Sequence, residues 1–219
     1  MNDGPPPFTT PYIPDPAHVV QDLASLLAHY GEISAPAIAK QVDHLHPHYQ
    51  SFIRAAPFVV LASVGPGSPE LTPRGDPAGF VEIEDQHTLL LPDRRGNNRI
   101  DNLRNIVADP RVSLLFLIPG IGETLRVNGT AQISTDPALL ARFELNGKQP
   151  ATVLVVRVAT VFFQCAKALV RSKLWDPDSR IPRSALPSNG TILAAITKKP
   201  DTAEDYDRAA PARLLATLY

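Results

Sequence analysis

The chain has 219 residues, enough for one domain with appendages or for two small domains. Its hydrophobic content of 44%, charged content of 20% and formal net charge of −1 argue against a general nucleic-acid-binding protein. A single cysteine, Cys165, excludes an internal disulfide, and no apolar run approaches the roughly 20 residues that a membrane span requires. With an N-terminus unlike a signal peptide, these features predict a cytoplasmic protein without nucleic-acid or membrane partners.

The first quarter of the chain is expected to contribute little to a core. Residues 1–16 hold six prolines and predict an extended arm. Residues 17–55 predict an N-terminal helical segment. Its first helix is expected to start at Pro16, with Asp15 as the candidate N-cap, and to end at about Gly31. A weaker amphipathic segment is expected from Pro36 to Leu45.

Three histidines alternate after this segment, at positions 44, 46 and 48. In a strand they would share one face and could hold a metal. Pro47 interrupts the run and no carboxylate follows at ligand spacing, so the pattern favours a polar helix end and predicts no metal site.

Between residues 56 and 180 the sequence changes to short apolar runs that predict strands. The expected strands cover residues 58–63, 70–83, 88–91, 112–118, 125–133 and 151–163. The run at 112–118 is expected to be buried on both faces, whereas alternation places Leu125, Val127 and Ala131 inward. Short helices are expected at 99–107 and 137–145, then a linker over 181–200 and a last helix over 203–218. Six or seven strands in hairpin-like succession favour an antiparallel barrel over a doubly wound sheet.

A polar loop follows the strand at 88–91, which is expected to break at Pro92. Arginines 94, 95 and 99 are charged donors, and Asn97 and Asn98 are amide donors around Gly96. The free N–H groups of the next helix add to these, and together they suit a phosphate. The alternative is a solvated helix N-terminus that binds nothing.

Two further stretches offer groups for a planar anionic ligand. In Thr72-Pro-Arg-Gly-Asp76, Arg74 supplies a cation and Gly75 lets a flat ring approach the backbone; the alternative is a turn arginine without a ligand. Lys167 and Arg171 would share a helix face with Trp175 one turn beyond. The alternative there is an amphipathic helix end with the indole in the core.

These stretches carry four motifs in a fixed order. They are Pro-Arg-Gly-Asp (73–76), Gly-Asn-Asn-Arg (96–99), Glu-Thr-Leu-Arg-Val-Asn-Gly (123–129) and Lys-Ala-x-x-Arg-Ser-x-Leu-Trp (167–175). Over about residues 18–186 the chain resembles the pyridoxamine 5′-phosphate oxidase-like family of FMN-binding split-barrel proteins, in particular a bacterial branch with these motifs.

The resemblance implies a mainly β protein with flanking helices (α+β), built on a six-stranded antiparallel split β-barrel over residues 56–180. It also implies a homodimer with FMN in two interface clefts, and a region 181–219 that packs on the barrel or on the partner. Arg74 or Lys167 would lie near the flavin as a cation. The implied cofactor-binding residues are Thr72, Arg74, Gly75, Asp76, Leu91, Pro92, Asn97, Asn98, Arg99, Gln164, Lys167, Arg171 and Trp175.

Two departures from the family pattern bear on activity. Gln164 stands where this branch more often has histidine, and the C-terminal arginine and histidine that hold substrate in true pyridoxamine phosphate oxidases are not evident, which argues against vitamin B6 oxidation. No acid–base catalyst stands out, since Asp76 and Asp93 suit turn caps. The expected function is a flavin-dependent oxidoreductase acting on an unidentified small molecule. Alternatives are a flavin carrier or sensor, or a split barrel that uses a deazaflavin or haem.

Overall fold

The computed structural model describes residues 12–66, 68–199 and 202–219. Most of the arm predicted over residues 1–16 therefore lies outside the described residues. The chain divides into two compact units, with the boundary between Ala39 and Lys40. The predicted division into arm, helical segment, barrel and C-terminal region stays a prediction.

In the first unit every described side chain up to residue 39 is exposed. Its elements are the 3-10 turn η1 (Pro16–His18) and the helices α1 (Leu23–Leu27) and α2 (Ala35–Ala39). The single helix predicted from Pro16 is wrong. Asp15 does cap η1, but Val19 is extended and Asp22 caps a new helix by accepting the Ser25 N–H at 2.7 Å. Among residues 12–39 these short helices bury no apolar side chain that would help to extend them.

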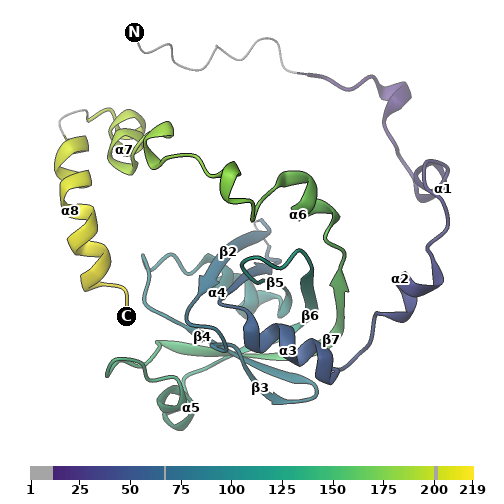
Figure 1. Cartoon of the computed structure of the whole chain (residues 1–219), viewed down its shortest axis with the longest axis horizontal. Coiled ribbons are helices and arrows are strands. Elements are labelled where there is room, and N and C mark those ends of the chain that lie inside the picture. Colours follow the sequence, from purple (N-terminus) through teal and green to yellow (C-terminus); the bar gives the residue numbers. More distant parts are fainter. Residues whose placement is uncertain (1–11, 67, 200–201) are drawn as a thin grey trace. The chain divides into compact units, whose positions relative to one another are not determined.

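The second unit is built around one antiparallel sheet of seven strands in the order β2-β1-β5-β6-β7-β4-β3 (Figure 1). The strands are β1 (Phe58–Ser63), β2 (Glu70–Gly75), β3 (Glu82–Asp85), β4 (Thr88–Asp93), β5 (Arg111–Leu117), β6 (Thr124–Ser134) and β7 (Thr152–Gln164). The prediction of a mainly β protein with an antiparallel sheet is confirmed.

The count of six strands that the resemblance implies is wrong, because the stretch expected to be one strand over 70–83 forms two. β2 pairs with β1, whereas β3 pairs with β4 at the opposite edge of the sheet. Pro77 and Gly79, which has a φ of +88°, lie between them and turn the chain out of the first strand.

The expectation that the strand breaks at Pro92 is wrong, because β4 continues through this residue. Pro92 pairs with Val153 of β7, while the β3 partners on the other side reach only as far as Leu90. A proline is tolerated within a strand where one side of the ladder has no neighbour. The strand therefore continues to Asp93 and brings that carboxylate to the rim of the barrel.

The core fills the inner face of the sheet. Leu61, Leu114 and Phe116 are at most 1% exposed, and the predicted inward residues Leu125, Val127 and Ala131 are buried. In β5, buried and half-buried residues alternate, so the expectation of a strand buried on both faces is wrong. Its second face is an outer surface of the sheet.

Helices of the second unit lie before, between and after the strands. They are α3 (Pro47–Ala55), α4 (Asp101–Ala108), α5 (Pro137–Arg142), α6 (Lys167–Ser172), η2 (Pro177–Ser179), η3 (Arg183–Ala185), α7 (Asn189–Thr197) and α8 (Ala203–Ala216). His46 is the N-cap of α3, so the histidine run lies at the start of a helix. The last helix was predicted, but α7 occupies the expected linker. Within the described ranges, no helix combines the length and apolarity needed to cross a membrane.

Candidate functional site

Two crossed ion pairs join the end of β2 to the end of β4. Arg74 of β2 pairs with Asp93 of β4, and Arg94 just after β4 pairs with Asp76 just after β2, with Arg94 Nε 2.7 Å from Asp76 Oδ2. All four side chains are at most 20% exposed. Both carboxylates thus bind arginines, and the expectation that they cap turns is wrong. Burial makes such pairs costly to break, because removing one partner leaves the other charge without compensation.

Arg74 also retains an unused donor. It lies level with Val59 of β1, on the face of β2 that points toward the core. Its Nε is buried and has no hydrogen-bond partner among the described residues. A buried N–H without a partner costs free energy, so this atom marks a place where an acceptor from outside the chain would be stabilising.

Asn102 ties helix α4 to the same edge of the sheet. This side chain, 2% exposed, accepts a hydrogen bond from the Thr72 hydroxyl at 2.6 Å. Its amide donates to the Ser63 hydroxyl at 2.8 Å and to the Glu70 carbonyl at 3.2 Å. Thr72 is therefore held by the helix, and the start of α4 is held against β2.

The predicted phosphate loop lies between β4 and α4, and its residues from 95 to 100 are exposed. Asn97 Oδ1 accepts the Arg99 N–H at 2.9 Å, and Asn98 has a φ of +59°. No side chain caps the first turn of α4, which leaves its N–H groups available. The Arg99 guanidinium pairs with Asp101 at 2.9 Å, so an anion would have to compete with this carboxylate.

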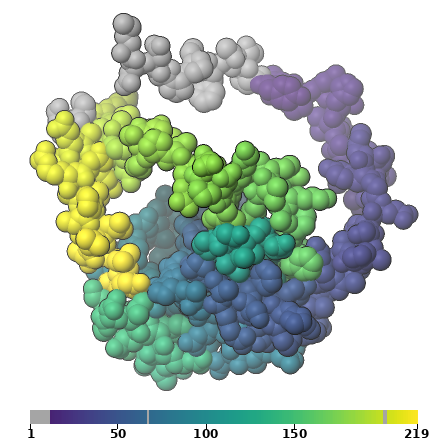
Figure 2. All heavy atoms as spheres, viewed as in Figure 1, coloured from purple at the N-terminus to yellow at the C-terminus, as the bar shows by residue number. Residues whose placement is uncertain are grey.

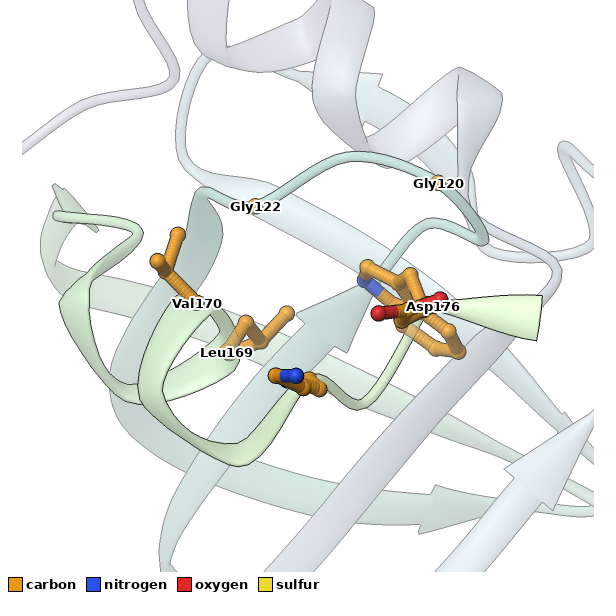
Figure 3. Close-up of a pocket in the computed structure, with 7 residues that line it drawn as sticks. Gly120, Gly122, Leu169, Val170 and Asp176 are labelled. Atoms are coloured by element: carbon orange, nitrogen blue, oxygen red, sulfur yellow. The ribbon is translucent and has the colours of Figure 1, made fainter. Parts of the chain in front are cut away.

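The second predicted group gathers around α6 at the turn between β5 and β6. Trp175 Nε1 donates to the Ile121 carbonyl at 2.8 Å, and a β-carbon on Gly122 would come within 2.7 Å of Ala166 Cβ. A cavity of about 300 Å³ is lined by Gly120, Gly122, Leu169, Val170, Lys173, Trp175 and Asp176 (Figure 3). The teal spheres of this turn lie against the green α6 segment in Figure 2.

Lys167 and Arg171, the two cations predicted to share a face of this helix, both lie in α6 and are exposed. Neither side chain makes a hydrogen bond or ion pair with another described residue. Trp175 is half-buried, so the alternative of an indole in the barrel core is not what the structure shows.

One chain does not bring the two groups together. Gly75 is level with Phe58 and Leu117, whereas Gln164 is paired with Thr124 two strands further along the sheet. Closure of the barrel brings β2 to β4, the neighbour of β7, but Asp93, the partner of Arg74, is level with Thr152 at one end of β7, whereas Gln164 is at the other end of that strand. Among the described residues no hydrogen bond or ion pair joins the two groups.

The sequence reading missed Arg94 as the partner of Asp76, and Asn102 as the link to Thr72. Asn102 lies four residues before the buried Ile106, so it occupies the buried face of α4. Ile100 and Val107, apolar residues whose helical spacing also suits that face, are 44% and 79% exposed. The sequence signal for a buried Asn102 is its position on the same helix face as the apolar Ile106, four residues later.

Comparison with known families identifies the barrel. The family model described as "Pyridoxamine 5'-phosphate oxidase" matches residues 45–165, more than half of the chain. The chain belongs to the pyridoxamine 5′-phosphate oxidase family. Its fold is accordingly the split barrel of that family, with the seven strands given above. Among curated proteins no sequence matches this chain.

Several solved structures resemble this family member over about half of its length. HupZ from Group A Streptococcus is 18% identical, with a TM-score of 0.46 over 55% of this chain and 94% of that chain. A protein from Clostridium acetobutylicum related to general stress protein 26 is 13% identical, with a TM-score of 0.42 over 54% and 86%. The FAD binding protein from Mycobacterium smegmatis is 12% identical, with a TM-score of 0.39 over 56% and 97%.

Proposed function

We propose that the protein is an FMN-dependent oxidoreductase that acts on a small molecule and works as a homodimer. FMN, when bound, supplies the redox chemistry. The chain binds the cofactor, orients its ring and keeps water away from it. Family membership and two features of the β2–β4 rim support this assignment.

The observation that carries the proposal is the buried, unpartnered Nε of Arg74. Arg74 is held in place by Asp93, so its remaining donor has a fixed direction. An acceptor on the edge of a flavin ring satisfies this donor and removes the cost of leaving it unpaired. Gly75 follows directly, but it is level with Phe58 on the opposite, exposed face of β2, so its missing side chain does not contribute to a ring site at Arg74 Nε.

The phosphate of FMN would lie at the loop before α4. Asn97, Asn98 and Arg99 provide amide and guanidinium donors, and the uncapped first turn of the helix provides N–H groups. A phosphate dianion attracts Arg99 more strongly than the single carboxylate of Asp101 does, and so can take over that guanidinium.

A second copy of the chain would supply Gln164, Lys167, Arg171 and Trp175 to this site. The outer face of the sheet supports such a homodimer, because half-buried Val60 and Leu115 lie level on it, followed by the exposed Arg126, whose guanidinium lies 5.4 Å from the ring centroid of half-buried Phe162. Beside it runs a polar row in which Ser113 bonds Asn128 at 2.8 Å and Asn128 bonds Thr160 at 3.1 Å. Apolar area with internally satisfied polar groups suits burial against an identical face.

The test is a titration of the purified protein with FMN, followed by absorption and by ultracentrifugation. The wild type is expected to be a yellow dimer. The Arg99→Ala variant is expected to lose most of its bound flavin while its circular dichroism spectrum stays unchanged. Arg104→Ala, one turn further along an exposed part of α4, is the matched control and keeps its flavin. A colourless protein that ignores added FMN, or an Arg99→Ala variant that stays fully yellow, refutes the assignment.

One observation favours a second function, a flavin carrier or sensor without turnover. Asp76 and Asp93, the carboxylates nearest the proposed ring site, are both engaged by arginines and so are not free to exchange protons with a substrate. Anaerobic addition of NAD(P)H separates the two functions, because bleaching of the bound flavin indicates an enzyme and persistent colour with every donor indicates a carrier.

A further inference from the structure

An aromatic ring from the last residue of the sequence covers the Arg94–Asp76 ion pair. The Tyr219 ring centroid lies 5.9 Å from Arg94 Cζ, and the Tyr219 hydroxyl donates to Asp76 Oδ1 at 3.1 Å. Lys148 Nζ donates to the backbone oxygen of Tyr219 at 2.9 Å. None of these contacts was expected from the sequence, and they occur beside the residues assigned to the flavin ring.

The ion pair presents a defined set of binding groups. The Asp76 side chain is only 1% exposed, and its Oδ2 already accepts from Arg94. Arg94 Nη1 is also used, since it donates to the Phe143 carbonyl at 2.5 Å. What remains is one carboxylate oxygen that needs a donor and the flat face of a guanidinium, which together suit a planar aromatic ring with an N–H or O–H at its edge.

Tyr219 has these properties. The hydrogen bond to Asp76 raises the pKa of the phenol, more than desolvation does, so the hydroxyl stays protonated and continues to donate near neutral pH. The Asp76 carboxylate is thus satisfied in the absence of any ligand.

The segment that carries Tyr219 makes its firmest contacts within its own hairpin. Helix α8 packs on α7, where Gly190 N–H donates to Asp207 Oδ1 at 2.8 Å. Leu214, Leu215 and Leu218 are 63%, 77% and 51% exposed, so they do not reinforce the docking of the ring. Few interactions therefore have to be lost when the ring leaves.

We propose that Asp76 and Arg94 form a binding subsite for a planar aromatic ring with an edge donor, that Tyr219 is its internal occupant, and that the isoalloxazine ring of FMN displaces it. The isoalloxazine carries one ring N–H flanked by carbonyls, which replaces the phenol as donor to Asp76. This inference rests on the proposed function, because that function places the flavin ring beside residues 74–76.

Affinity for FMN is the first readout. Removal of the competing ring in Tyr219→Ala is expected to tighten FMN binding about tenfold, the equivalent of one hydrogen bond to a charged group. Tyr219→Phe keeps the ring and loses the donor, so its affinity falls between that of Tyr219→Ala and that of the wild type. The control is Tyr206→Ala, which removes a tyrosine that stacks on Arg213 at 4.3 Å, and it binds FMN as the wild type does.

Release of the tail is the second readout. Saturating FMN is expected to speed tryptic cleavage after Arg208 and Arg213, which lie on α8, because displacement of Tyr219 loosens the hairpin from the barrel. Slower cleavage with FMN, or a Tyr219→Ala variant that binds FMN no more tightly than the wild type, overturns the inference and leaves the proposed function standing. Failure of every variant to bind FMN overturns both. Binding by Tyr219→Ala alone supports both.

Discussion

Replacement of Asn102 by alanine tests how the site is held together. Its amide group is the only described link between the Thr72 hydroxyl of β2 and helix α4, and it also bonds Ser63 and the Glu70 carbonyl. Asn102→Ala leaves these partners in a place that is almost closed to water. The edge strand β2 and the start of α4 should then separate more easily.

The magnitude follows from the three bonds that are lost. Each neutral hydrogen bond contributes about 1 kcal/mol net, within a range of about 0.5–1.5 kcal/mol, so the loss of three bonds amounts to about 2–4 kcal/mol. Ser63 keeps Asn105 as a weaker donor at 3.4 Å, which limits the loss at that hydroxyl. The free energy of unfolding should fall by about 2–4 kcal/mol, and Tm by about 4–16 °C for a chain of this length.

Urea unfolding followed by circular dichroism measures this loss as a lower midpoint with an unchanged slope. Asn105→Ala is the matched control, because it lies one turn later on the same helix and makes longer bonds, at 3.4 Å to Ser63 and 3.1 Å to the Ser68 carbonyl. That variant should lose less than about 1 kcal/mol. Equal losses in the two variants would refute the reasoning that the buried amide fixes this edge of the sheet.

Two other predictions concern the barrel and its acid stability. A β-carbon at Gly129 would come within 2.0 Å of the Arg157 carbonyl oxygen, so Gly129→Ala should lower the midpoint of thermal unfolding, whereas Gly96→Ala, which meets nothing within 4 Å, should not. Hydrogen bonds from Arg111 lower the pKa of Asp109 from 3.8 to about 2. The wild type should therefore exceed Asp109→Asn in stability above about pH 4 and lose that advantage as the pH falls to about 2, measured by urea unfolding across that range.

Local patterns predicted the strands well, since β1 was expected at the residues where it occurs and β6 alternates as its sequence indicated. The two errors in the sheet concern pairing. The residues from 70 to 83 do not indicate that the two halves of this stretch lie at opposite edges of the sheet. The reason is that β2 pairs with β1 in one hairpin and β3 pairs with β4 in another. Pro92 was read as a break because the missing neighbour that permits it lies elsewhere in the sheet.

The candidate site shows the same limit of local reasoning. The motif residues Arg74 and Asp76 could be named from the sequence, but their partners Asp93 and Arg94 could not be paired with them, because closure of the barrel alone brings residues 74 and 93 together. Asp93 and Arg94 are adjacent in sequence, at the end of a strand where successive side chains point to opposite faces, so nothing local indicates which residues they bind. In the structure they bind different residues of the same motif, since Asp93 pairs with Arg74 and Arg94 pairs with Asp76.

The Arg74–Asp93 and Arg94–Asp76 ion pairs give the two parts of the proposed flavin site, the rim and the loop before α4, different net charges. Two arginines and two aspartates at the rim cancel in charge, so the rim suits a ring without net charge and gives a phosphate little attraction. The exposed loop that follows carries Arg95 and Arg99 against Asp101, and this excess favours the phosphate there. Added salt should therefore weaken the binding of FMN far more than that of riboflavin, which has the same ring without the phosphate. Equal salt dependence for the two ligands would mean that the loop does not bind the phosphate.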